Sequence, residues 1–240
     1  MPQTPSTYAV GVSNSVKRWA AQLQRHDHSQ RREILDANSG LPGPRANTSL
    51  AIALATVADS DVIDQLLASD DEYQMMCGAV CLGALVADAA VHARLRPLAV
   101  DERWRVREGV VIGMQAAGDT DLAAVQSVVL EWAGEADPLI ARAAAATICE
   151  PRLLRSPGAA AIAIEVCRRA TAVLIALPTA SRRTAAARTL RQSLGYCWSV
   201  AVAADPQPGL AAFGTLDTTD PDLEWITRTN RTKKRLARLL

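Results

Sequence analysis

Aromatic residues are scarce in this 240-residue chain: they make up 4% of it, and Phe213 is the only phenylalanine. β-Sandwiches and barrels depend on aromatic and β-branched residues, and no segment of the sequence alternates apolar and polar residues for long enough to form a convincing strand. Alanine, the best helix former, is instead the most frequent residue, and it lets helix axes approach closely. The composition therefore predicts an all-α fold.

Long apolar runs are also missing. The longest uncharged run that is mainly apolar, Tyr73–Ala87, has 15 residues, whereas a helix needs about 20 apolar residues to cross a bilayer. The first residues, MPQTPSTYAVGVSNSVKRW, carry no apolar core behind a basic start and do not resemble a secretory signal peptide. We therefore expect a soluble cytoplasmic protein that does not contact membranes.

Motifs of the common enzyme classes are absent from the sequence. There is no glycine-rich phosphate loop, no G-x-S-x-G and no H-E-x-x-H. The three histidines do not cluster with cysteines at zinc-ligand spacing, and the five cysteines, an odd number in apolar segments, fit small reduced core residues. We expect no metal and no cofactor. The cysteines are Cys77, Cys81, Cys149, Cys167 and Cys197.

Charge is balanced overall, at +1, but it is distributed unevenly. Residues 46–138 carry 5 basic and 15 acidic side chains, whereas residues 139–204 carry 9 basic and 2 acidic ones. Such a dipolar chain can steer an asymmetric partner, although salt screens the field beyond about 8–10 Å. The alternative is that solvated helix faces simply differ in sign.

Helical periodicity recurs along the chain, and Asp, Gly or Pro residues divide it into segments. Several segments begin at residues that can cap a helix N-terminus: Ser60 or Asp61, Asp70, Asp101, Asp119, Asp137, Ser181 and Asp220. The predicted helices are 13–24, 29–37, 46–58, 60–68, 71–87, 89–98, 102–117, 120–134, 138–150, 158–176, 181–203, 208–214 and 221–238.

Several of these segments share a pattern: an Asp at a turn, then an apolar residue, an Arg and a run of small residues. Asp101–Met114 and Asp137–Ile148 match it best, and Asp70–Leu85 and Asp220–Asn230 are degenerate copies. Arg107, Arg142 and Arg228 occupy the same place in their copies. Periods of about 30–47 residues built from helix pairs are typical of α-solenoids.

In this pattern residues 46–240 resemble the HEAT-repeat family. The resemblance implies a right-handed α-α superhelix that ends in a basic C-terminal capping helix, with residues 1–45 as an N-terminal helical cap and linker. It also implies that the Asp closes the turn between paired helices and that the Arg reaches the neighbouring repeat. The structural repeat positions would be Asp101, Arg107, Asp137, Arg142, Asp220 and Arg228.

Tryptophans offer a second interpretation of the same pattern. Trp104 and Trp225 each follow an Asp and precede an Arg by three residues. The DNA alkylation-repair glycosylases, a HEAT-like family that this pattern distantly resembles, use Trp, Asp and Arg on a basic concave surface, where bases stack on aromatic rings. If an active site exists, Asp101, Trp104, Arg107, Trp198 and Trp225 are the first candidates. A purely structural role explains the pattern without chemistry and is preferred.

Basic residues give the clearest functional clue. A stripe of arginines can contact phosphates without reading sequence, although cations near a helix C-terminus also complement the helix dipole. The candidate contact residues in the arginine-rich segment are Arg168, Arg169, Arg182, Arg183, Arg188 and Arg191, and those in the C-terminal tail are Arg231, Lys234 and Arg235.

Three functions follow from these observations. The preferred one is a non-enzymatic scaffold that binds a protein, or another macromolecule, on its concave face. The first alternative is a DNA-binding protein or alkylation-repair-like glycosylase, which requires that the arginine-rich segment and at least one Trp meet in one concavity. The second is a chromophore- or ligand-handling HEAT protein related to lyases, which requires a deep apolar pocket around Tyr196, Cys197 and Trp198.

Overall fold

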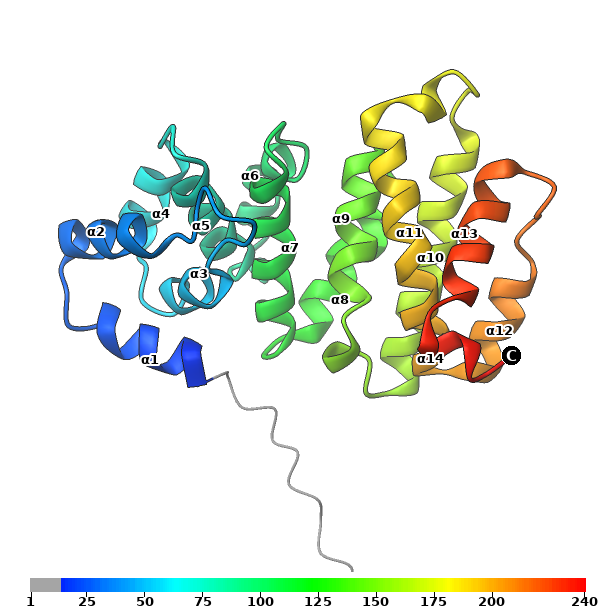
Figure 1. Cartoon of the computed structure of the whole chain (residues 1–240). Helices are drawn as coiled ribbons and strands as arrows, with labels where there is room; N and C mark the ends of the chain where they lie inside the picture. The colour runs from blue at the N-terminus through cyan, green and yellow to red at the C-terminus, as the bar shows by residue number, and fades with distance from the viewer. Residues whose placement is uncertain (1–13) are drawn as a thin grey trace, which may run out of the picture.

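The computed structural model describes residues 14–240, and the regular structure in this range is helical, with no strand (Figure 1). The all-α class is therefore confirmed for the described part of the chain. The first 13 residues, and with them the start of the predicted N-terminal cap, lie outside the described residues. The α-helices are α1 (Asn14–Leu23), α2 (His28–Asn38), α3 (Thr48–Leu54), α4 (Ser60–Leu67), α5 (Glu72–Gly83), α6 (Ala89–Ala99), α7 (Trp104–Gly118), α8 (Leu122–Trp132), α9 (Pro138–Ile148), α10 (Pro157–Ala176), α11 (Ala185–Ala204), α12 (Pro206–Gly214), α13 (Pro221–Arg231) and α14 (Lys234–Ala237). Two short 3-10 turns, η1 (Pro151–Leu153) and η2 (Ser181–Arg183), precede α10 and α11.

The helix starts follow side-chain capping. Asp137 and Asp220 cap α9 and α13 as predicted. Elsewhere the cap lies one to three residues from the predicted one, because the carboxylate or hydroxyl must reach an N–H two or three residues ahead. The observed caps at these places are Asp59, Asp71, Asp121 and Thr184.

Asp101 is not an N-cap, contrary to the prediction. Its carboxylate accepts hydrogen bonds from the backbone N–H and the guanidinium of Arg103, each at 2.9 Å, so it closes the turn before the helix. Arg103 occupies the capping position without a side-chain bond, and α7 begins at Trp104.

The C-terminal helix predicted over 221–238 is also broken. Lys233 has an extended backbone between α13 and α14. Buried Asn230 donates to the carbonyls of Ile226 (2.8 Å) and Leu194 (2.9 Å), which ties the end of α13 to α11. The break turns α14 back so that Leu236 is fully buried.

The odd-numbered helices form one layer. α1 packs on α3, α3 on α5, and so on through α7, α9 and α11 to α13, whereas α4, α6, α8, α10 and α12 pack against one or both of the odd-numbered helices adjacent in sequence. Figure 1 shows α9, α11 and α13 side by side. Within this odd-helix layer α11 and α13 run in parallel. Arg191, in the first half of α11, contacts Asp222 at the start of α13, and Ser199, farther along α11, contacts Asn230 near the end of α13. Every second helix therefore returns to the odd-helix layer, so that the fold repeats a unit of two helices.

Glycines set the spacing between α5 and α7. A Cβ on Gly113 would lie 2.3 Å from the carbonyl oxygen of Val80 and 2.9 Å from the Cα of Gly83, and a Cβ on Gly109 would lie 2.6 Å from the carbonyl oxygen of Met76. Such distances are shorter than van der Waals contact, so only glycine allows these two helices to approach this closely. The small residues of the predicted repeat pattern thus act at a helix crossing.

Buried apolar side chains form one continuous core from Val16 to Leu236. All five cysteines are buried in it, as the sequence predicted, and none forms a disulfide. Within the described range, every helix is too short or too polar to cross a membrane.

Candidate binding surface

The odd-helix layer has one face that the described helices leave open. α11 is flanked by α9 and α13 and backed by α10 and α12, so the exposed residues in its middle lie on the remaining side. Arg188, Gln192 and Tyr196 are exposed at intervals of four residues, which places them on one stripe. We define the odd-helix face by this stripe and its partly exposed counterparts on neighbouring helices: Trp104, Glu108 and Ile112 of α7, Arg142 and Ala146 of α9, and Trp225 of α13.

Arginines lie over aromatic rings on this face. The guanidinium carbon of Arg105 is 4.6 Å from the ring centroid of Trp104, and that of Arg235 is 4.9 Å from the ring of Tyr196. Trp104 remains 49% exposed and Tyr196 43% exposed. Cation–π contacts at exposed sites are worth about 0.5–1 kcal/mol. The two rings are therefore held in place while much of their surface stays accessible.

Trp225 is seated more deeply on the same face. Its ring rests on Gly195 of α11, where an added Cβ would lie 2.7 Å from the indole, and the guanidinium of Arg191 covers it at 4.6 Å. Leu223 and Ile226 on the same helix are buried. Gly195 thus lets an aromatic residue of α13 approach α11 closely.

An open hollow of about 540 Å³ adjoins the odd-helix face, where α10 ends and α11 and α13 begin. We call it the basic hollow, and its lining residues are Thr179, Arg182, Arg183, Arg188, Arg191, Asp220, Pro221 and Asp222. Four of the nine basic residues singled out in the sequence therefore meet at one place. Trp225 lies beside it, under Arg191.

Two of these arginines are engaged within the protein. Arg182 pairs with Asp220 at 2.6 Å and donates to the carbonyls of Ile175 and Leu177, so it caps the end of α10. Arg191 pairs with Asp222 at 3.0 Å, and its Nε is buried without a hydrogen-bond partner.

Asp220, in the lining of the hollow, has a lowered pKa. Burial alone would raise the pKa of Asp220, but hydrogen bonds from Arg182 and from the backbone N–H groups of Asp222 and Leu223 lower it overall. Arg183 and Arg188 are exposed and form no ion pair within the described part of the chain. Two uncompensated guanidinium groups therefore face solvent at this hollow.

The other predicted basic residues lie elsewhere. Arg168 and Arg169 both pair with Glu165 on α10, at 2.8 and 2.6 Å, and Arg169 also donates to the carbonyl of Leu130 on α8. The pKa of Glu165 falls to about 2, chiefly because Arg168 hydrogen-bonds its carboxylate. These arginines therefore belong to the layer of even-numbered helices.

The basic tail lies at the opposite end of α13 from the basic hollow. Arg231 and Lys234 are exposed there, and Arg235 contacts Tyr196. The chain therefore carries three separate basic groups rather than one stripe.

Trp198 is a core residue. It is fully buried and donates its indole N–H to the hydroxyl of Thr171 at 3.1 Å, with Phe213 5.7 Å away ring to ring. Its neighbour Cys197 is buried as well, whereas Tyr196 is exposed. The three residues therefore do not line a common pocket of the kind that the chromophore-binding alternative requires.

The repeat arginines differ in what they contact. Arg142 donates to the carbonyl of Arg107 at 3.5 Å, which links α9 to α7. Arg107 instead turns back to the carbonyls of Asp101 and Glu102, and Arg228 forms an exposed pair with Glu224.

The centre of the odd-helix face carries two half-buried charges. Burial lowers the pKa of the Arg142 guanidinium. Burial also raises the pKa of the nearby Glu108 carboxyl, and the positive charges of Arg142 and Arg105 partly oppose this rise. Neither Glu108 nor Arg105 stands out in the sequence, because both lie outside the repeat positions.

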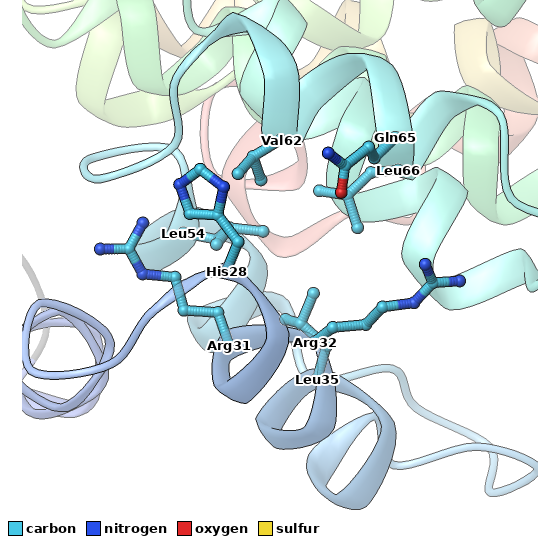
Figure 2. Close-up of a pocket in the computed structure, with 8 residues that line it drawn as sticks. All are labelled: His28, Arg31, Arg32, Leu35, Leu54, Val62, Gln65 and Leu66. Carbon is cyan, nitrogen blue, oxygen red and sulfur yellow. The ribbon is translucent and has the colours of Figure 1, made fainter.

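A much smaller pocket lies between α2 and α4 (Figure 2). Its cavity of about 20 Å³ has room for roughly one water molecule. His28 faces Asp59 at 3.2 Å, and Arg31 donates to the carbonyls of Leu23 and Val57, so most of its polar rim is already occupied. Figure 2 draws the lining residues His28, Arg31, Arg32, Leu35, Leu54, Val62, Gln65 and Leu66. We regard it as a packing gap.

The sequence and structure were compared with known families and proteins. No family model, curated protein or solved structure matches the chain. Among residues 14–240, no group of three or more His, Cys, Asp or Glu side chains is placed to hold a metal ion.

Proposed function

We propose that this protein is a HEAT-like α-solenoid, a right-handed α-α superhelix whose odd-helix face is the concave surface that binds another macromolecule. The stacking of α1 to α13 in steps of two helices supports the architecture. The observation that carries the function is the pair of exposed rings, Trp104 and Tyr196, each held by an arginine on the open face of the layer. Tyr and Trp are enriched at interfaces, because each offers a large apolar ring with a polar group at one end.

A protein is the partner that this face suits best. Tyr, Trp and Arg are the residues that dominate the binding energy of protein interfaces, where surrounding contacts exclude water from them. Trp104, Tyr196, Trp225 and Arg188 fit this composition.

The chemistry of the cysteines gives them a packing role and not that of a nucleophile. The thiolate is the reactive form of cysteine, and burial in apolar surroundings disfavours it. Burial raises the pKa of Cys81 to about 12 and that of Cys77 well above its ordinary value. The thiols therefore serve as packing groups.

Site-specific photo-cross-linking tests the proposal. A photoreactive amino acid placed at Trp104 or Tyr196 should cross-link to a partner protein in cells that express the full chain. The same residue at exposed Ala161 of α10 or Gln207 of α12, in the even-numbered helices, is the matched control and should not. Cross-links from the control positions alone would contradict the proposal.

Nucleic acid is the second candidate partner. The observation that favours it is the meeting of Arg182, Arg183, Arg188 and Arg191 beside Trp225, which is the convergence that a DNA-binding surface requires. Binding to a labelled duplex, with and without an alkylated base, should then be tight at about 50 mM salt and much weaker at about 200 mM. Preference for the alkylated duplex would support a glycosylase-like activity, and absence of binding at low salt would exclude this candidate.

A further inference from the structure

We propose that the basic hollow binds an acidic segment of a partner polypeptide, through a carboxylate or phosphoryl group held by Arg183 and Arg188. This inference rests on the proposed function, because it names the chemistry of the partner that the odd-helix face binds. The ligand group is an oxyanion presented by an extended chain.

Ion pairs within the protein hold the walls of the basic hollow in place. Arg182 ties Asp220 of α13 to the end of α10, and Arg191 ties Asp222 of α13 to α11. All four of these side chains are partly buried and held by ion pairs. The walls are thus fixed before any ligand arrives, which reduces the entropy lost on binding.

The proposed binding groups are the guanidinium groups of Arg183 and Arg188, which form no ion pair with the described part of the chain. Arg183 ends the turn that leads into α11, and Arg188 lies in the first turn of that helix. Both are exposed, and neither pairs with a carboxylate of the described chain. A guanidinium presents a planar fork of donors that matches a carboxylate or a phosphoryl group. The positive end of the 20-residue helix α11 lies beside them and adds to the attraction.

The acidic lining favours a short acidic segment over a nucleic acid. Asp220 and Asp222 face the same hollow, and they would repel phosphates that follow one another along a backbone. Nucleic-acid binding proteins commonly neutralise about 6–10 phosphates, whereas only two arginines here are uncompensated. A single acidic group can use these two and avoid the aspartates.

The distance from Arg188 to Tyr196 sets the spacing of residues expected in the bound segment. Arg188 and Tyr196 are eight residues apart on one stripe of α11, which corresponds to about 12 Å along the helix. An extended peptide covers this distance in three or four residues. The expected ligand therefore carries an acidic residue followed, three or four residues later, by an apolar residue that packs on the exposed ring of Tyr196.

Fluorescence anisotropy with synthetic peptides tests the inference. Three labelled peptides share a leucine four residues after the variable position, which is glutamate, phosphoserine or glutamine. The full-length protein should bind the glutamate or phosphoserine peptide at least tenfold more tightly than the glutamine peptide. The stronger of the two identifies the oxyanion.

Paired charge reversals locate the site. Arg183→Glu with Arg188→Glu should weaken binding at least tenfold, and the milder Arg183→Gln with Arg188→Gln should weaken it in the same direction. The matched control is Arg155→Glu with Arg238→Glu, because both residues are exposed arginines outside the hollow, and it should change the affinity less than twofold. Circular dichroism checks that each variant folds.

Three results would overturn the inference. The first is that the wild-type protein binds the acidic peptides no more tightly than the glutamine peptide. The second is that the control reversal weakens binding as much as the hollow reversal. The third is that a single-stranded oligonucleotide binds more tightly and displaces the peptide. In each case cross-links from Tyr196 would still support the odd-helix face, whereas cross-links confined to Ala161 and Gln207 would reject the proposed function itself.

Discussion

The guanidinium of Arg191 lies over the indole ring of Trp225, with its carbon 4.6 Å from the ring centroid, while its Nη1 donates to Asp222 at 3.0 Å. One side chain of α11 thus holds both an aromatic ring and a carboxylate of α13. Because Arg191 lines the basic hollow and Trp225 belongs to the odd-helix face, this contact joins the two proposed binding features.

Replacement of Arg191 should destabilise the α11–α13 junction. Arg191→Ala leaves Asp222 with only the more distant Arg182 at 3.8 Å and uncovers the Trp225 ring. Loss of a hydrogen bond between charged groups costs about 1.5–3 kcal/mol. Urea unfolding should show a decrease in that range, and Arg188→Ala, which breaks no ion pair, should change the stability by less than about 0.5 kcal/mol. Equal effects of the two variants would contradict this role.

Gly113→Ala should destabilise the protein through the crossing of α5 and α7. The added methyl group would meet the carbonyl oxygen of Val80 at 2.3 Å, and overpacking of this kind costs about 1–3 kcal/mol. Gly158 is the matched control, since a Cβ there meets nothing within 4 Å in the first turn of α10. Gly158→Ala should be neutral or stabilising, because alanine favours a helix. Thermal unfolding of both variants distinguishes the outcomes.

Acid should weaken the contact between Glu165 and its two arginines. The pKa of Glu165 is lowered to about 2, mainly by Arg168, so the contact stabilises the fold above the ordinary value near 4.5 and is lost as the pH falls towards 2. Carbon NMR titration of the carboxyl group should give a midpoint near 2, and Arg168→Ala with Arg169→Ala should return it towards 4.5. A midpoint near 4.5 in the wild-type protein would show that the contact does not form.

Both repeat arginines should contribute to stability, though for different reasons. Arg142→Ala removes a half-buried side chain that reaches from α9 to the carbonyl of Arg107, and Arg107→Ala removes two bonds within the turn before α7. We expect each to cost about 1–2 kcal/mol, measured by urea unfolding. Exposed Arg155→Ala is the control, and unchanged unfolding of both repeat variants would reject their structural role.

Local sequence carried most of the information about the helices. Capping residues such as Asp137 and Asp220 satisfy N–H groups two or three positions away, so the sequence alone reveals them. The break after Arg231 was not visible in this way. It lies next to Asn230, which bonds to Leu194, 36 residues earlier, and local periodicity does not reveal a contact of this kind.

The candidate site was only partly predictable for the same reason. The charge excess of residues 139–204 pointed to Arg183 and Arg188, which remain unpaired. It could not show that Asp220 and Asp222, more than 30 residues away, neutralise Arg182 and Arg191. Trp104 and Trp198 were both candidate contact residues, yet one is 49% exposed and the other fully buried, since neighbouring helices decide which side of a helix is covered.

The role of the odd-helix face can be tested by two single substitutions in one capture assay with the cross-linked partner. Tyr196→Glu places a charge on the odd-helix face, and Ala161→Glu places the same charge on the exposed side of α10. If the partner binds the odd-helix face, Tyr196→Glu abolishes its capture and Ala161→Glu retains it, with both variants folded by circular dichroism. Retention by Tyr196→Glu together with loss by Ala161→Glu would show that the partner binds the other layer.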